Sequence, residues 1–310
     1  MNKVAITGGT GFIGAALIDA LIAEGADVVA LARNPEKIKT RDGLRVVKGD
    51  LDNEAALNEL SRGADTVFHL AGLTHARDEQ AFRDVNVKGA ARTARIAADH
   101  HAVFVHSSSL SAREPHLSSY ARSKADSEGA VRSAVANRPF VMLRLPAIYG
   151  PGDMALLPYF KLVRGGFAPE PRTIGTAMVT LLHVADAAGA LVAAAKKAPP
   201  GMVYDVGDDT RDGRSWSDIA CEIGDAFGKR PRMIKVPRGL MATMASVSGA
   251  AEKLLNRPAQ LRPGQVNELF HPHWVARDAL LNDAIDWAPR FSLKEGVSQT
   301  IDWYRDNGLL

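Results

Sequence analysis

Tyr120 and Lys124 stand four residues apart in the run Tyr120-Ala121-Arg122-Ser123-Lys124. In an α-helix this spacing places both side chains on one face. A tyrosine with an ordinary pKa of about 10 is a weak acid–base catalyst at neutral pH, and a neighbouring ammonium group is expected to lower that pKa by stabilising the phenolate. The pair therefore predicts proton transfer to or from a substrate oxygen. The alternative is an ordinary surface contact along a helix.

Three adjacent hydroxyl groups follow an apolar run earlier in the chain, where Phe104-Val105-His106 leads into Ser107-Ser108-Ser109. Ligands of open parallel sheets bind at the carboxyl ends of the strands. A serine at such a strand end could orient a substrate carbonyl. The serines do not lie in a G-x-S-x-G turn, so an acyl-transfer nucleophile is not indicated.

A glycine-rich run connects the first expected strand to the first expected helix: Thr7-Gly8-Gly9-Thr10-Gly11-Phe12-Ile13-Gly14. It satisfies both G-x-G-x-x-G, from Gly9, and G-x-x-G-x-x-G, from Gly8. Backbone without Cβ atoms can approach a dinucleotide pyrophosphate, and amides at a helix N-terminus bind its charge. Because the run lies between a strand and a helix, we interpret it as a phosphate cradle rather than as a tight turn alone. The expected cofactor contacts are Gly8, Thr10, Gly11, Phe12, Ile13 and Gly14.

Arg33 follows the second expected strand, at the position where sites that prefer NAD usually carry an acidic residue. A guanidinium group there suits a 2′-phosphate, because its planar donors match the phosphate oxygens. The sequence therefore favours NADP(H), with NAD(H) as the alternative.

Short apolar runs alternate with segments of helical period through the first half of the chain. Strands are expected at 4–7, 27–31, 44–47, 66–70, 102–106 and 140–145, and helices at 12–23, 54–60, 80–98 and 119–136. This alternation is typical of a Rossmann-type α/β fold with a doubly wound parallel sheet.

The second half of the chain is richer in Pro and Gly and less regular. We expect residues 1–150 to form a dinucleotide-binding core and residues 151–310 to form mainly a smaller C-terminal substrate lobe. Residues from about 175 to 210 are expected to return to the core. Further helices are expected at 185–197, 216–227 and 293–305.

Composition excludes several other classes of protein. The 310 residues carry a net charge of +3, and the basic residues are scattered, so no nucleic-acid partner is expected. The longest weakly polar stretch, 239–251, is shorter than the roughly 20 residues of a membrane span. The single cysteine, Cys221, excludes an intrachain disulfide and is expected to be a buried apolar residue. A cytoplasmic protein without membrane contact is expected.

A metal site is not expected either. The nine histidines include two close groups, His100-His101 and His271-Pro272-His273. Neither group has the carboxylate or cysteine neighbours typical of zinc or iron ligands.

The order of these motifs resembles the extended short-chain dehydrogenase/reductases, often labelled the NAD-dependent epimerase/dehydratase family, over nearly the whole chain. Six further segments carry the resemblance: Gly49-Asp50-Leu51, His69-Leu70-Ala71-Gly72, Val85-Asn86-Val87-Lys88-Gly89, the run from Leu143 through Pro146 to Gly152, Leu182-His183-Val184-Ala185-Asp186, and the last segment from Asp286 to Tyr304. The resemblance implies that Asp50 and Leu51 meet the adenine, that Leu70, Ala71 and Gly72 line the cofactor, and that Pro146 passes the nicotinamide.

The same resemblance assigns roles at the reaction centre. It makes Tyr120 the general acid or base, Lys124 its pKa modulator and a ribose ligand, and Asn86 a structural or proton-relay residue. Ser109 matches the family's strand-end hydroxyl best, with Ser108 second. Leu110-Ser111 occupies the place where 4,6-dehydratases carry an Asp-Glu pair, and the Ser109–Tyr120 connection is shorter than in typical sugar-nucleotide epimerases.

The sequence therefore predicts an NADP(H)-dependent oxidoreductase that transfers hydride between the nicotinamide and a carbonyl or alcohol of a small-molecule substrate. A nucleotide-sugar epimerase is the second hypothesis, and a non-catalytic NADP(H)-binding scaffold or sensor is the third. Family analogy also suggests a homodimer formed through the helices expected at 80–98 and 119–136.

Overall fold

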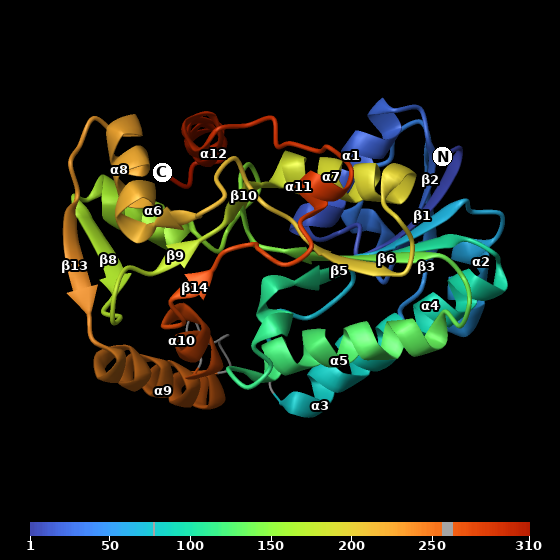
Figure 1. Ribbon diagram of the computed structural model, residues 1–310, viewed down its shortest axis with the longest axis horizontal. Coiled ribbons are helices and arrows are strands. Elements are labelled where there is room, and N and C mark those ends of the chain that lie inside the picture. The colour runs from blue at the N-terminus through green and yellow to red at the C-terminus, as the bar shows by residue number, and fades with distance from the viewer. Residues whose placement is uncertain (77, 256–262) are drawn as a thin grey trace.

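A seven-stranded parallel sheet organises the first part of the computed structural model, which describes residues 1–76, 78–255 and 263–310 (Figure 1). The strand order is β11-β6-β5-β4-β1-β2-β3, so the chain winds outward in both directions from β1. The strands are β1 (Lys3–Thr7), β2 (Asp27–Ala32), β3 (Leu44–Lys48), β4 (Thr66–His69), β5 (Val103–Ser109), β6 (Phe140–Leu145) and β11 (Met202–Asp205). The sequence-based expectation of a doubly wound Rossmann-type sheet is confirmed.

Helices cover both faces of this sheet (Figure 1). Helices α1 (Phe12–Ala23) and α7 (Val184–Lys197) pack on one face, and α2 (Glu54–Ser61), α4 (Ala90–Asp99) and α5 (Ser119–Ala134) pack on the other. Successive strand residues enter opposite cores, as when Val4 and Ile6 join the α1 side and Ala5 joins the other side. Burial on both faces explains why the strands are continuously apolar rather than alternating.

The helix expected at 80–98 is three pieces. Helix α3 (Glu79–Phe82) leads into a π-helical segment, Arg83–Gly89, which is followed by α4. π-helical turns inside helices often mark functional sites, because the wider turn redirects one side chain. Asn86 lies on this segment and is buried.

The C-terminal half builds a second lobe from small sheets. They contain β7 (Ala147–Tyr149) with β10 (Leu181–His183), β8 (Phe167–Pro171) with β13 (Arg232–Val236), and β9 (Met178–Val179) between β12 (Arg214–Ser215) and β14 (His273–Trp274). Its helices are α6 (Leu157–Arg164), α8 (Trp216–Ala226), α9 (Arg238–Leu255), α10 (Pro263–Leu269), α11 (Leu281–Ala284) and α12 (Leu293–Asp306). Its core joins α6, α8 and α12 through residues such as Phe160, Ile223 and Tyr304.

Two elements of this half belong to the large sheet. Helix α7 packs beside α1, and β11 adds the strand next to β6. The sequence reading missed β11 because it is only four residues long and lies between turns. It also ended β5 too early, since the strand continues through Ser109 rather than ending at His106.

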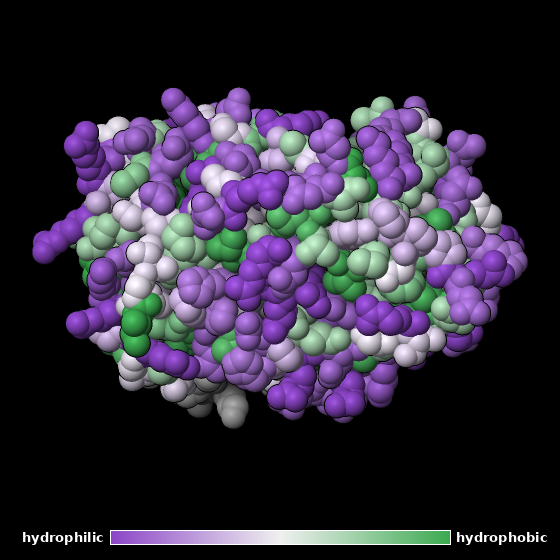
Figure 2. Space-filling model, in the orientation of Figure 1, coloured by the Kyte–Doolittle hydropathy of each residue, from purple (hydrophilic) through white to green (hydrophobic). Residues whose placement is uncertain are grey.

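Hydrophilic residues are spread over the face drawn in Figure 2, with hydrophobic residues between them in small areas. Of the helices that the structure describes, none is both long and apolar enough to cross a membrane. Among the same residues, no group of three or more His, Cys, Asp or Glu side chains could hold a metal ion. Cys221 is exposed on α8, so the expectation of a buried cysteine is wrong. The buried face of α8 is formed instead by Ile219, Ala220 and Ile223.

Candidate active site

Tyr120 and Ser109 meet where β5 ends and α5 begins. The Ser118 side chain caps α5 by accepting a hydrogen bond from the Ala121 amide, which places Tyr120 in the first turn. Burial is the largest influence on the Tyr120 phenol and raises its pKa to about 12, a hydrogen bond with Ser109 lowers it, and the Glu268 carboxylate raises it. The phenol is therefore protonated at neutral pH and can act as a proton donor.

Lys124 lies one turn further along α5 and is buried. Its ammonium Nζ donates a hydrogen bond to the backbone carbonyl oxygen of Ser107 at 2.6 Å. Burial lowers its pKa to about 8, against the opposing charge of Glu128. Burial and Glu268 together outweigh the hydrogen bond from Ser109, so the pKa of Tyr120 is raised in this structure. The role expected of Lys124 as a modulator of that pKa stays a prediction.

Ser108 is part of a polar cluster behind the site. Its hydroxyl donates to Glu128 Oε1 at 2.6 Å, and Arg144 holds the same carboxylate with two hydrogen bonds of 2.9 and 2.8 Å. Ser108 and Arg144 are paired in the β5–β6 register, so both reach the same side of the sheet. This arrangement distinguishes the adjacent serines. The Ser109 side chain is hydrogen-bonded to Tyr120, whereas the Ser108 hydroxyl is hydrogen-bonded to Glu128.

Two buried histidines lie beside Lys124 and are held neutral. Burial lowers the pKa of His69 to about 3, and burial also lowers the pKa of His106 well below its ordinary value. The positive charge of Lys124 lowers both pKa values further. His69 Nδ1 lies 2.8 Å from Thr7 Oγ1, and His106 Nε2 lies 3.0 Å from Ser127 Oγ. Of these three neighbouring side chains, Lys124 is therefore the one that carries a positive charge at neutral pH.

The glycine-rich loop forms one wall of a cavity of about 320 Å³. The wall depends on Gly8, whose φ is +79° and where a Cβ would lie 2.5 Å from the Ala71 amide nitrogen. It also depends on Gly14, where a Cβ would lie 2.1 Å from the Gly8 carbonyl oxygen. A side chain at either position would therefore overlap backbone atoms of the loop or of the wall that faces it.

The cavity brings together most of the cofactor contacts expected from the sequence. Its lining includes Gly8, Thr10, Gly11, Arg33, Asp50, Leu51, Leu70, Ala71 and Gly72. The Asp50 carboxylate accepts the amides of Asp52 and Asn53 and so shapes the turn after β3. Phe12, Ile13 and Gly14 are outside the lining, at the start of α1, and Pro146 lines a different cavity.

Asn86 fixes the loop after β4 to α5. Its Oδ1 accepts from the Leu73 amide at 2.7 Å, and its Nδ2 donates to the Leu73 carbonyl at 2.9 Å and to Ser123 Oγ at 2.9 Å. Through these hydrogen bonds Asn86 connects the loop after β4, which lines the glycine-rich cavity, to the helix that carries Tyr120.

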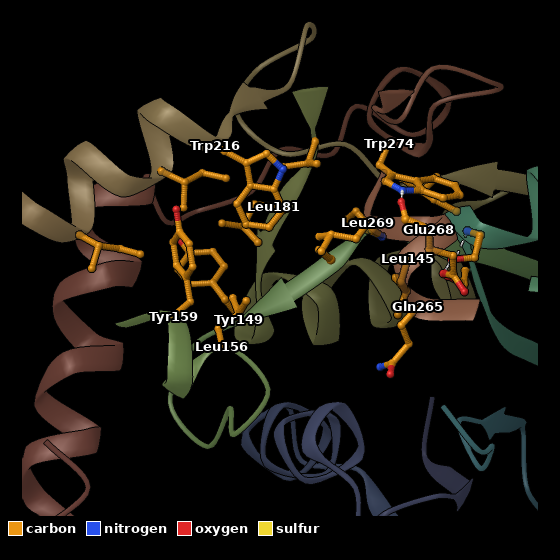
Figure 3. Close-up of a pocket in the computed structure, with 18 of the residues that line it drawn as sticks. Leu145, Tyr149, Leu156, Tyr159, Leu181, Trp216, Gln265, Glu268, Leu269 and Trp274 are labelled. Carbon is orange, nitrogen blue, oxygen red and sulfur yellow. Dashed lines mark hydrogen bonds between the residues drawn. The ribbon is translucent and has the colours of Figure 1, made fainter. Parts of the chain in front are cut away.

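A second cavity, of about 350 Å³, is lined by Ser109 and by residues of the C-terminal lobe. Figure 3 shows ten of its lining side chains by name. Tyr149, Tyr159 and Trp216 lie toward one end, and Trp274 and Glu268 lie toward the other (Figure 3). The remaining lining is mainly aliphatic and aromatic: Leu110, Leu145, Pro146, Ala147, Leu156, Phe160, Val179, Leu181, Ile219, Ile223, Leu269 and Val297, with Ser111 and Gln265. This volume and lining are typical of a site that binds a largely apolar ligand or the apolar part of a larger one.

The sequence reading missed Glu128, Arg144 and Glu268. A signal for the first two exists in the sequence. Arg144 interrupts an otherwise apolar strand, and a partly buried arginine requires a partner. Glu268 is distant in sequence from Tyr120 and comes to the site only because α10 packs beside the start of α5, where Ser118 donates to it.

Comparison with known proteins agrees with this arrangement. Residues 4–207, more than half of the chain, match the family described as "NAD dependent epimerase/dehydratase family". The chain belongs to this family. The epimerase/dehydratase resemblance predicted from the sequence is therefore confirmed, and the protein is an NAD(P)-dependent oxidoreductase or epimerase.

Two curated relatives and one solved structure illustrate the range of the family. "Ceramide reductase" of Caulobacter vibrioides (strain NA1000 / CB15N) is 38% identical over 309 residues, which cover 99% of this chain and 96% of the relative. "4-hydroxy-2-methyl-3-oxo-4-farnesyl-3,4-dihydroquinoline-1-oxide ketoreductase" of Stigmatella aurantiaca is 33% identical over 64% of this chain and 66% of the relative. The Bordetella bronchiseptica enzyme WbmH, solved with NAD+, has a TM-score of 0.76 at 20% identity and covers 99% of both chains.

Proposed function

We propose that this member of the epimerase/dehydratase family reduces a ketone group on a substrate with a long apolar part, with NADPH as the preferred coenzyme. The observation that carries the proposal is the apolar cavity lined by Ser109, because the Ser109 side chain is hydrogen-bonded to Tyr120. A ketone at Tyr120 would have the rest of its molecule in that cavity.

The glycine-lined cavity fits a dinucleotide coenzyme. Gly8 and Gly11 would face its diphosphate, and Ala71 would line the opposite wall. Arg33 is exposed at the end of β2 and lines the same cavity, where its guanidinium group could pair with the 2′-phosphate of NADPH. NADH is the alternative coenzyme. When bound, the nicotinamide supplies the hydride.

The residues of this chain supply the proton and hold the substrate. Ser109 and Tyr120 donate hydrogen bonds to the ketone oxygen, which orients it. As hydride adds to the carbonyl carbon, Tyr120 transfers its phenolic proton to the oxygen, so the ketone becomes an alcohol and the phenol becomes a phenolate. Lys124 stabilises that phenolate by its charge, and a proton from solvent restores the phenol.

The named activities of both curated relatives support reduction of such a ketone. One is named a ceramide reductase, and the other is a ketoreductase whose named substrate carries a farnesyl chain. Both names describe substrates with long apolar chains.

The epimerase alternative is less favoured by the apolar cavity. A nucleotide sugar carries a diphosphate that normally requires basic side chains. Among the described residues, none that lines this cavity is Lys, Arg or His. A scaffold without catalysis is less favoured because it does not require the Ser109–Tyr120 contact.

The test is turnover of NADPH with long-chain ketones, followed as loss of absorbance at the nicotinamide band. Tyr120→Phe should lower the rate by about a hundredfold or more, because the proton donor is removed. Tyr204→Phe is the matched control, since Tyr204 is a buried tyrosine of the sheet core outside both cavities, and its rate should be close to that of the wild type. Interconversion of a sugar nucleotide without net change in coenzyme would favour the epimerase, and tight coenzyme binding without either reaction would favour the scaffold.

A further inference from the structure

The position of Glu268 indicates which chemical group the substrate carries on the carbon next to its ketone. An inference about that group rests on the proposed function. Glu268 and Ser109 both line the apolar cavity. It also lines an adjoining pocket that contains Tyr120 and Ser118. Glu268 is therefore shared by the pocket at Tyr120 and the apolar cavity, so a substrate that spans the two would lie against this residue.

Glu268 is held in place from both halves of the chain. Its Oε2 accepts from Ser111 Oγ at 2.8 Å, and its Oε1 accepts from Ser118 Oγ. The indole Nε1 of Trp274 donates to its backbone carbonyl oxygen at 2.7 Å (Figure 3). The side chain is therefore fixed relative to Tyr120, two residues along the chain from Ser118, rather than free to turn into solvent.

The carboxylate has remaining capacity to accept hydrogen bonds. A carboxylate offers about four acceptor positions, and the two serines use two of them. Within residues 1–76, 78–255 and 263–310, no Lys, Arg or His side chain forms an ion pair with it. An acid in this position, between an apolar cavity and a proton donor, gains most from a substrate group that donates a hydrogen bond.

We propose that Glu268 accepts a hydrogen bond from a hydroxyl or amide N–H group on the carbon next to the substrate ketone. The substrate class is then an α-hydroxy- or α-amidoketone with a long apolar chain. Glu268 selects this class by its contact with the donor, while Tyr120 and Ser109 engage the ketone oxygen in any ketone substrate.

The experiment compares a long straight-chain α-hydroxyketone with its methyl ether, which has the same ketone and chain but no donor. The wild type should prefer the hydroxyketone in kcat/KM by about tenfold to a hundredfold, which is the usual effect of a hydrogen bond to a charged group. Glu268→Leu should abolish the preference, and Glu268→Gln, which keeps an acceptor without the charge, should retain part of it. Because each variant is judged by the ratio of two substrates, a general loss of activity cancels.

Glu114→Gln is the matched control. Glu114 also contacts the C-terminal segment, where it lies 3.9 Å from His271, but it lines neither the apolar cavity nor the pocket at Tyr120. This variant should keep the wild-type preference. Loss of the preference in Glu114→Gln as well as in Glu268→Leu would overturn the assignment.

Binding separates this inference from the proposed reductase activity. Trp216 and Trp274 line the cavity, so quenching of tryptophan fluorescence reports the dissociation constants of both ketones without turnover. Suppose that NADPH is consumed with neither ketone, but that the wild type binds the hydroxyketone more tightly than its methyl ether and Glu268→Leu binds both alike. The reductase proposal then fails, and the Glu268 contact is supported. If the wild type treats hydroxyketone and ether alike within threefold in binding and in any turnover, the Glu268 proposal is refuted.

Discussion

Gly8 and Gly25 offer a matched test of the coenzyme cradle. Both have a φ of +79°, so an alanine at either position occupies the left-handed region at a cost of about 1 kcal/mol. A Cβ at Gly8 would lie 2.5 Å from the Ala71 nitrogen and 2.6 Å from the Leu70 carbonyl carbon. A Cβ at Gly25 would meet nothing within 4 Å in the described part of the chain. The two substitutions therefore differ mainly in the steric overlap.

That overlap sets the expected magnitudes. The atoms facing Gly8 are backbone, so they cannot rotate away, and forcing them apart costs about 1–3 kcal/mol in addition to the φ penalty. Gly25→Ala should lower the free energy of unfolding by about 1 kcal/mol, and Gly8→Ala by about 2–4 kcal/mol. Because we propose that the amides of the shifted loop bind the coenzyme diphosphate, Gly8→Ala should weaken NADPH binding by about tenfold or more, which corresponds to about 1.4 kcal/mol.

Urea unfolding followed by circular dichroism measures the first quantity, and titration of NADPH against protein fluorescence measures the second. Gly25→Ala should keep the wild-type dissociation constant. Equal destabilisation by the two variants, or an unchanged NADPH affinity in Gly8→Ala, would refute the assignment of the glycine-rich loop as the cradle.

Three further predictions concern single side chains. Arg33→Ser should raise the dissociation constant of NADPH by about tenfold and leave that of NADH nearly unchanged, because only NADPH carries the 2′-phosphate. Titration of both coenzymes measures the two constants. Equal losses of affinity for both coenzymes would contradict the preference for NADPH. The pKa of His69 falls from 6.5 in the unfolded chain to about 3 in the fold, so its contribution to stability is complete above pH 6.5 and is lost as the pH falls toward 3. Urea unfolding should show about 2 kcal/mol less stability from this residue at pH 5 than at pH 7, and His69→Gln should remove that part of the pH dependence. Glu128→Gln should lower the pKa of Lys124 below about 8, because the charge of Glu128 raises that pKa. The loss of ketone reduction at alkaline pH should then move to lower pH by about one unit in the pH–rate profile. An unmoved profile would argue against a role for the Lys124 charge.

Most of the sheet and the glycine-rich cavity could be predicted from the sequence because their signals are local. A buried parallel strand is a short apolar run, and the cradle requires glycine at fixed positions after the first one. The adjacent serines were harder to separate. Alternation along a strand distinguishes Ser108 from Ser109, but only once the strand is known to continue to Ser109.

The remaining features depend on tertiary structure. The spacing of Tyr120 and Lys124 gives their position on one helix face, yet the phenol's pKa is set by burial and by Glu268, which comes from α10. Strand β11 has too few residues to give a periodic signal and is recognised by its pairing with β6. The apolar cavity joins strand ends of the sheet to α6, α8, α10 and α12, so no single segment of the sequence contains it.

The return of α7 and β11 to the large sheet has a consequence for attempts to shorten the protein. A fragment ending at residue 150 would lack α7, which buries Leu191 and its neighbours against α1, and would leave the hydrogen-bonding edge of β6 exposed. Bare strand edges promote aggregation. The nucleotide-binding half therefore cannot be cut out at the end of its sixth strand, and any minimal version has to carry the intervening lobe segments or replace them with a designed linker.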